Sequence, residues 1–322
     1  MSPAGGNARG PWSRRLGLGS RTGGGLALPA GLLLLGWLMG CEAGRGDGAR
    51  LEGTRPVLVG SKNFTESLLL GEIVAQQLER YGVPVRRKLY LGGTFVCHQA
   101  LVAGQLDLYV EYTGTAYSAI LHLPATQDRL RVRQQVDSIY RARWGVAWSE
   151  PLGFNNTFAM LLRRRDAERL GIRTLSQAVP YARNWRPAFG YEFAEREDGY
   201  RGLLKAYGLA FASRPATMDL GLTYRALAEG RADIIAGNST DGQIAALDLF
   251  PLEDDRHYFP PYEAAPVVRQ GVLDRFPAAR TALARLAGTI SDETMRQLNY
   301  QVDVGQRPPA EVAKTFLAGL PR

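Results

Sequence analysis

Two segments of the chain repeat the same pattern at an offset of 126 residues, the first over residues 100–113 and the second over residues 226–239. In each segment an expected helix ends at a glycine, Gly104 or Gly230, which can take the left-handed conformation that closes a helix. A short apolar strand follows. The repeat predicts two similar α/β lobes, although so short a match of common residues also arises by chance.

Ligands of open α/β sheets bind beyond the carboxyl ends of the strands. In the two repeated segments those ends fall at residues 111–115 and 238–241. If the two lobes face each other, both ends border one cleft, so we expect a single ligand site between the lobes.

A third strand end is expected after the apolar run at residues 56–60, where Lys62 precedes a helix that we expect to continue to about Arg80. Asn63 and Glu66 have the spacing of a capping box. A lysine at a helix N-terminus suits a carboxylate or phosphate ligand. An exposed lysine beside a well-capped helix is the alternative interpretation.

Residues 1–40 are typical of an export signal. Four arginines without an acidic residue precede an apolar stretch at residues 26–39, which is shorter than the roughly 20 residues of a membrane-spanning helix. The stretch ends at Gly40-Cys41 and resembles a lipobox, so we expect Cys41 to be lipidated and residues 41–56 to form a linker. An ordinary secretory signal is the alternative. The prediction is an exported lipoprotein, periplasmic or on the cell surface, anchored to a membrane.

Charge and composition argue against several function classes. The net charge of +8 falls to +4 once residues 1–40 are removed, and the remaining arginines are mixed with acids, as at residues 163–166. Nucleic-acid binding, which needs a clustered basic face, is therefore not expected. Cys97 has no disulfide partner if Cys41 is lipidated.

An enzyme is not expected either, and neither is a metal or a cofactor. Cys97 and His98 are neighbours on an expected helix and would not face each other. The chain has three scattered histidines, and it lacks a glycine-rich phosphate loop and an H-E-x-x-H pattern.

Seven motifs follow one another along the chain: GSKNFTE at 60–66, LGGTFVCH at 91–98, EYTGT at 111–115, GFNNT at 153–157, MDLGLTY at 218–224, LEDD at 252–255 and FPPY at 259–262. Together they resemble the osmoprotectant-binding proteins of ABC importers, of the ProX, OpuBC and OsmF type. The resemblance implies an α/β periplasmic-binding-protein fold, type II-like, with a ligand cleft between two lobes and a two-strand hinge. We expect residues 57–155 and 261–322 to form lobe 1 and residues 156–260 to form lobe 2, with Pro260 and Pro261 stiffening one crossing.

The resemblance also implies a ligand with a trimethylammonium group. Such a cation is bound by aromatic faces, each contributing roughly 0.5–2 kcal/mol. By resemblance, the cage consists of Tyr112, Phe158, Asn238 and Tyr262. Asn238 departs from the pattern, because tighter-binding members have tyrosine there. The cage is therefore expected to be weaker, or to be shaped for a different cation. Phe158 keeps the ring but lacks the hydroxyl of the tyrosine that is frequent at its position.

The carboxylate of a betaine would be held, by resemblance, by Lys62, Thr115 and Arg196, and the backbone around Asn156 would place a carbonyl near the cation. Arginine can bind a carboxylate through two parallel hydrogen bonds. A plain surface arginine is the alternative for Arg196.

These expectations describe a monomeric binding protein that captures glycine betaine, choline or a related quaternary-ammonium osmoprotectant. It would deliver the ligand to an ABC permease. The expected partners are therefore this permease and, through it, an ATPase. The ligand is expected to favour lobe closure because it touches both lobes. The alternative keeps the fold but binds a different small zwitterion, or acts as a solute sensor.

Overall fold

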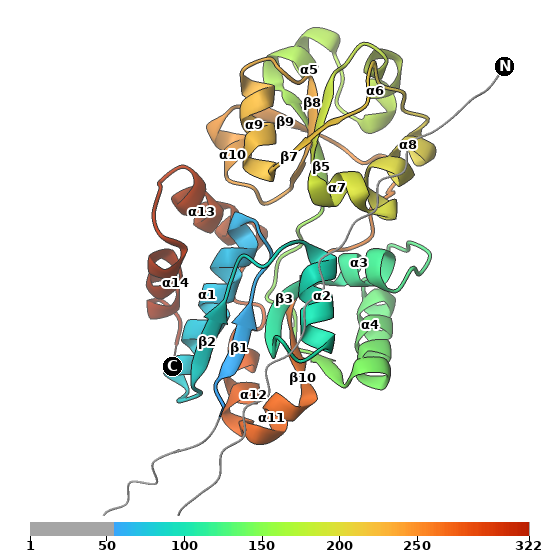
Figure 1. The fold of residues 1–322 in the computed structure, drawn as a ribbon. Helices are drawn as coiled ribbons and strands as arrows, with labels where there is room; N and C mark the ends of the chain where they lie inside the picture. Colours follow the sequence, from blue (N-terminus) through green and yellow to red (C-terminus); the bar gives the residue numbers. More distant parts are fainter. Residues whose placement is uncertain (1–54, 322) are drawn as a thin grey trace, which may run out of the picture. The chain divides into compact units, whose positions relative to one another are not determined.

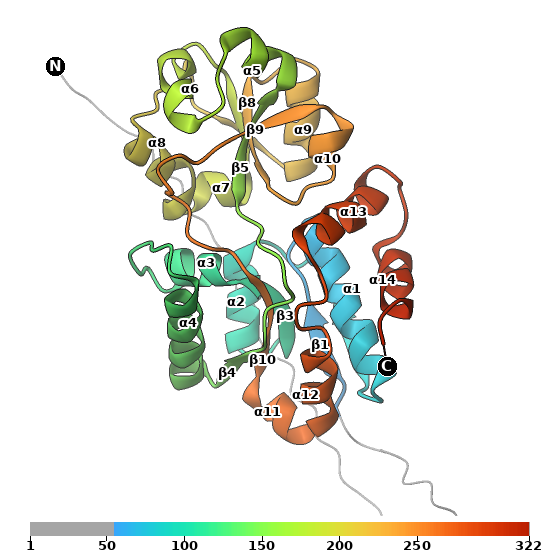
Figure 2. The ribbon, with the colours of Figure 1, turned by 180° about the vertical axis from the view of Figure 1, so that it is seen from behind.

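The computed structural model describes residues 55–321. The predicted export signal and Cys41 lie outside these residues. The described chain forms two five-stranded sheets, and Figures 1 and 2 show each sheet with its own helices. We call the first sheet with its helices the first lobe and the second sheet with its helices the second lobe. The predicted α/β class with two similar halves is confirmed.

The first sheet has the strand order β2-β1-β3-β10-β4. Its strands are β1 (Val57–Gly60), β2 (Val85–Lys88), β3 (Leu108–Tyr112), β4 (Val146–Trp148) and β10 (Ala264–Arg269). β1 is parallel to β2 and β3, whereas β10 is antiparallel to both β3 and β4.

The second sheet has the order β7-β6-β8-β5-β9. Its strands are β5 (Phe158–Arg163), β6 (Pro187–Gly190), β7 (Ala216–Met218), β8 (Ile234–Asn238) and β9 (Leu249–Leu252). β6 is parallel to β7 and β8, and β5 lies antiparallel between β8 and β9. Both sheets therefore place one antiparallel strand in the fourth position, beside the strand of the sequence repeat.

The helices of the first lobe are α1 (Thr65–Arg80), α2 (Thr94–Val102), α3 (Thr113–Thr115), α4 (Arg129–Trp144), α11 (Gln270–Arg275), α12 (Pro277–Ala284), α13 (Asp292–Asp303) and α14 (Pro309–Ala318), with a π-helical turn at Ala116–Ile120. Those of the second lobe are α5 (Arg164–Leu170), α6 (Leu175–Ala182), α7 (Tyr191–Glu195), α8 (Gly202–Tyr207), α9 (Leu220–Ala228) and α10 (Gln243–Ala246), with a π-helical turn at Glu197–Arg201.

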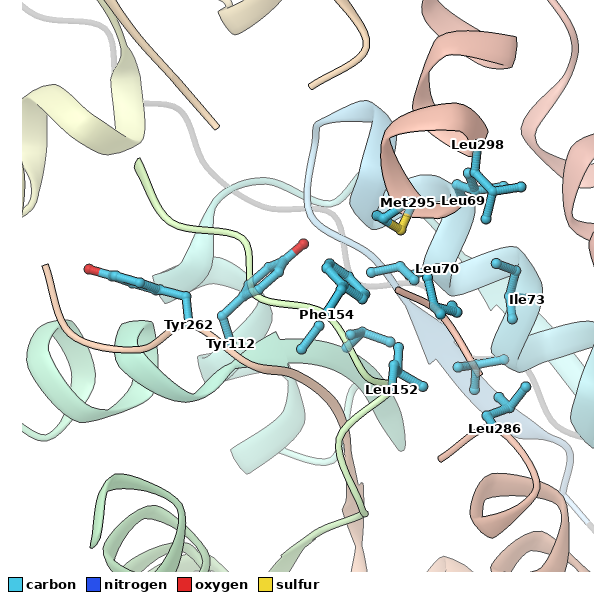
Figure 3. Close-up of a cluster of buried hydrophobic side chains, with 14 of the residues drawn as sticks. Leu69, Leu70, Ile73, Tyr112, Leu152, Phe154, Tyr262, Leu286, Met295 and Leu298 are labelled. Carbon is cyan, nitrogen blue, oxygen red and sulfur yellow. The ribbon is translucent and has the colours of Figure 1, made fainter. Parts of the chain in front are cut away.

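Apolar side chains cover both faces of the first sheet. Successive residues of a strand point to opposite faces. In β3, Leu108 and Val110 join the core under α1 and α12–α14, whereas Tyr109 joins the core formed with α2 and α4. Figure 3 shows the first of these cores extending from Leu298 past Phe154 to Tyr112 and Tyr262. Two rings predicted for the cation cage therefore belong to a packed core.

The sequence repeat corresponds closely to structure. The helices α2 and α9 are followed by Gly104 and Gly230, whose φ angles are 71° and 72°. The strands β3 and β8 follow at the same offset as in the sequence. The repeat ends after the strands: a helical turn begins at once after β3, but after β8 the next helix begins only at Gln243.

Two chain segments cross between the lobes and lie side by side. Asn155 and Glu263 form an antiparallel bridge. The backbone N–H of Asn156 donates to the carbonyl of Tyr262 at 3.0 Å, and the N–H of Tyr262 donates to Asn155 Oδ1 at 2.7 Å. The two crossings therefore position Asn156 and Tyr262 against each other at the lobe junction.

Candidate functional site

A cavity of about 220 Å³ lies between the carboxyl ends of strands from both sheets. The structure brings all eight residues of the predicted binding site to its wall: Lys62, Tyr112, Thr115, Asn156, Phe158, Arg196, Asn238 and Tyr262. Their positions follow from the topology, because β3 ends at Tyr112, β8 ends at Asn238, and Lys62 follows the end of β1.

Aromatic rings surround the predicted cation side of the cavity. The Phe158 ring lies 6.1 Å from that of Tyr262 and 4.9 Å from that of Phe193, measured between centroids. On the other side, the rings of Phe64 and Tyr112 are 6.4 Å apart. Rings from both lobes thus face one cavity, an arrangement that suits a diffuse cation.

Lys62 is a buried member of this site. Its side chain lies at the wall, and its ammonium pairs with Glu111 at 2.6 Å and donates to Thr94 Oγ1 at 2.7 Å. Lys62 is 1% exposed and Glu111 is fully buried. The alternative of an exposed lysine is therefore wrong.

The predicted capping box is also wrong. α1 begins at Thr65 with Phe64 as its N-cap, and no side chain caps it. Glu66 is instead buried and accepts four hydrogen bonds. Its donors are the Tyr112 hydroxyl (2.6 Å), Asn156 Nδ2 (2.8 Å), Thr240 Oγ1 (2.5 Å) and Asn299 Nδ2 (2.9 Å).

Burial raises the pKa of the Glu66 carboxyl, and its hydrogen bonds only partly offset that effect. Glu66 and Tyr112 lie in the first lobe, whereas Thr240 lies in the second. The Glu66 carboxylate therefore links the Tyr112 hydroxyl to the second lobe through Thr240.

Arg196 is held rigidly at the cavity. Its side chain is 2% exposed and makes two hydrogen bonds to Asp198, at 2.8 and 2.6 Å. Its Nη1 donates to Thr115 Oγ1 at 3.2 Å, across the lobes. The guanidinium lies 5.0 Å from the Phe158 ring centroid and 6.0 Å from that of Tyr262. The surface-arginine alternative is wrong.

Asn238 lines the cavity, but its amide is engaged. Its Nδ2 donates to the carboxylate oxygens of Asp241 at 3.2 and 3.4 Å, and its backbone N–H donates to the same carboxylate at 2.9 Å. Asp241 also accepts from the Tyr224 hydroxyl at 2.5 Å. Burial, together with the charges of Glu66 and Asp303, raises the pKa of Asp241 to about 7.

Several further wall residues were not predicted from the sequence, among them Phe64, Thr94, Glu192 and Phe193. Glu192 lies in the second lobe and accepts a hydrogen bond from Thr94 of the first. Burial opposes its ionisation, but the charges of Lys62 and Arg196 prevail and lower the pKa of its carboxyl. Phe64 and Thr94 lie inside two of the quoted motifs, and Glu192 and Phe193 lie within four residues of Arg196. Proximity in the sequence to a quoted motif or to a predicted site residue was the signal that could have identified these four residues.

Among residues 55–321, no group of histidine, cysteine and acidic side chains is arranged to hold a metal ion. None of the helices in that part of the chain combines the length and apolar character needed to cross a membrane.

Comparison with known proteins identifies the family. A family model described as the substrate binding domain of ABC-type glycine betaine transport system matches residues 55–319. The chain is 35% identical over 269 residues to a glycine-betaine-binding protein of Pseudomonas aeruginosa, with 80% of this chain and 86% of that protein covered. A crystal structure of a glycine betaine/carnitine/choline ABC transporter protein has 29% identity and a TM-score of 0.68, with 81% of this chain and 97% of that chain covered.

Another relative is the ergothioneine transport permease/ergothioneine binding protein EgtU of Helicobacter pylori, which is 38% identical over 269 residues. The match covers 83% of this chain and 48% of that protein, so the chain spans about half of its length. Members of the matched family are substrate-binding components of transport systems rather than enzymes. The fold, the sequence motifs and the family match agree, and the chain belongs to the family of substrate-binding domains of ABC-type glycine betaine transport systems.

Proposed function

We propose that the protein captures a small quaternary-ammonium solute outside the cytoplasm and delivers it to an ABC permease that is driven by an ATPase. Glycine betaine and choline are the first candidate ligands. The observation that carries the proposal is the composition of the cavity wall, which contains the rings of Tyr112, Phe158 and Tyr262 and the buried cations of Lys62 and Arg196. The rings suit a trimethylammonium group, and the cations suit a carboxylate.

Ligand-driven closure is part of this proposal. The cavity wall includes Tyr112 from the first lobe and Phe158 from the second. A ligand that contacts both lobes stabilises their closed arrangement, because it binds that state better than the open one. We further propose lobe boundaries at 155/156 and 260/261, a monomeric state, and membrane attachment through a lipid on Cys41.

Ergothioneine is a second candidate ligand. It carries a trimethylammonium group beside a carboxylate, and it is the ligand named for the relative that is 38% identical. Asn238 favours ergothioneine as a candidate, because an amide rather than an aromatic ring lies at that part of the cavity wall. A different zwitterion, or a sensing role without transport, remains the alternative to these ligands.

Isothermal titration of purified protein retaining residues 42–322 tests the proposal. We expect saturable binding of at least one of glycine betaine, choline, carnitine and ergothioneine, and no binding of proline, which lacks a trimethylammonium group. Replacing Tyr112 or Tyr262 with alanine should weaken that binding about tenfold, since each ring contributes roughly 0.5–2 kcal/mol. Unchanged affinity in both variants would remove these rings from the site, and silence across all the quaternary amines would refute the ligand class.

A further inference from the structure

The amide of Asn238 has a fixed orientation. When Asp241 is ionised, its carboxylate can only accept hydrogen bonds, so the group that faces it is then the Nδ2 of Asn238 rather than the amide oxygen. The contacts agree, with Nδ2 at 3.2 Å from Asp241 Oδ2 and the Asn238 backbone N–H at 2.9 Å from the same atom. The Tyr224 hydroxyl donates to this oxygen as well. Asp241 is therefore held in place from two sides and determines which way the amide points.

The side on which the amide oxygen lies follows from these contacts. Asp241 lines a separate groove beside α9 and α13, whereas Asn238 lines the ligand cavity and not that groove. Since Nδ2 is directed to Asp241 and Oδ1 diverges from the same carbon, Oδ1 is directed away from Asp241 and toward the cavity that Asn238 lines. Within residues 55–321, no protein group donates a hydrogen bond to Asn238 Oδ1. The cavity wall thus carries a preset acceptor without a protein donor.

This acceptor lies on the cation side of the cavity. Asn238 is directly opposite Phe158 in the antiparallel pair of β8 and β5. Side chains of directly opposed residues are neighbours on the same face of a sheet. The amide oxygen is therefore next to a ring predicted to hold the trimethylammonium group, at the position where the resemblance predicts another ring.

We propose that Asn238, oriented by Asp241, is a specificity-determining residue that accepts a hydrogen bond from an N–H or O–H of the ligand close to its quaternary ammonium. The inference rests on the proposed function and narrows its ligand class. Glycine betaine has no such donor, whereas choline has a hydroxyl. A ligand without a donor leaves the acceptor desolvated and unpaired, which is how a polar site rejects an analogue that lacks the matching group.

Choline and its O-methyl ether form the test pair, because they share the cation and the ether has a methyl group in place of the hydroxyl proton. Titration is done at pH 8, above the raised pKa of Asp241, so that the ionised carboxylate predominates. We expect the wild-type protein to bind choline about tenfold tighter than the ether, the effect of one hydrogen bond in a desolvated site. Asn238→Leu should bring the two affinities within about twofold of each other, mainly by weakening choline.

Two further variants complete the design. Asn184→Leu, at an exposed residue outside the cavity wall, is the matched control and should leave the ratio unchanged. Asp241→Asn no longer forces the Asn238 amide into one orientation and should reduce the preference for choline, with an unfolding curve showing that the variant is folded.

The outcomes separate the two proposals. Equal wild-type affinity for choline and its ether refutes the inference, as does an Asn238→Leu variant that keeps the wild-type ratio or loses both ligands equally. In those cases quaternary-ammonium binding still stands. If the wild-type protein binds no quaternary amine, the proposed function itself fails.

Discussion

Replacing Lys62 with methionine tests how much the first lobe depends on one buried ion pair. The ammonium of Lys62 lies 2.6 Å from the Glu111 carboxylate, and the two side chains are 2% and 0% exposed. Methionine keeps the length of the side chain and removes the charge. Glu111 would retain hydrogen bonds from the Tyr109 hydroxyl at 3.0 Å and the Tyr112 backbone N–H at 2.7 Å, but it would have lost its paired cation.

The expected loss is large for a single substitution. Removing one partner of a buried ion pair lowers the free energy of unfolding by about 3–5 kcal/mol, because the other charge stays buried without compensation. For a protein of this size each kcal/mol corresponds to about 2 °C in Tm. The Lys62→Met variant should therefore unfold about 6–10 °C below wild type.

Thermal and urea unfolding of ligand-free protein measure this loss; ligand must be absent because it would stabilise the folded state by mass action. The double variant Lys62→Met/Glu111→Gln carries neither charge and should recover at least half of the lost free energy. The reasoning is refuted if Lys62→Met unfolds within about 1 °C of wild type. It is also refuted if Glu111→Gln adds its own loss to that of Lys62→Met, since paired charges should not be independent.

Two other predictions concern pH and packing. The pKa of the Asp241 carboxyl is raised to about 7. The contribution of this group to stability is therefore fully present below about pH 4 and is lost as the pH rises through about 7. Relative to the Asp241→Asn variant, the wild-type protein should lose up to ~4 kcal/mol of unfolding free energy over that range. Urea unfolding of both proteins from pH 4 to 8 checks this, and a constant difference between them contradicts it. A Cβ on Gly114 would lie 2.7 Å from the Pro261 carbonyl oxygen and 2.9 Å from the Tyr262 ring, so Gly114→Ala should cost about 1–3 kcal/mol of stability and weaken quaternary-ammonium binding. Gly271→Ala, where a Cβ has no neighbour within 4 Å, is the matched control, and similar urea midpoints and affinities for the two variants would count against the packing argument.

Much of the fold could be predicted because its signals are local. A helix that ends at a glycine and an apolar strand that follows it are encoded within a few residues. The two glycines of the repeat, Gly104 and Gly230, have nearly the same φ angle in the two lobes. The extent of α1 to Arg80 was equally predictable from its apolar pattern.

The role of Glu66 could not be predicted, because its partners come from distant parts of the chain. Thr240 and Asn299 lie 174 and 233 residues away from it. The spacing of Asn63 and Glu66 satisfies a local rule, but burial among four donors outweighs the capping contact. The orientation of the Asn238 amide is a similar case. Asp241 is only three residues away, yet its own position depends on Tyr224 in another element.

The position of β10 constrains the order in which the chain can fold. β4 belongs to the first sheet, but its strand neighbour there is β10, which also pairs with β3. β10 begins at Ala264, after all five strands of the second sheet. The chain is synthesised from the N-terminus to the C-terminus. The second sheet can therefore assemble from one continuous stretch of chain, whereas the first sheet cannot be completed until β10 has been made. Domains generally fold as units during synthesis. The lobe that begins the folded chain is therefore the last to be completed, and a chain cut short before Ala264 would contain a finished second sheet and an unfinished first one.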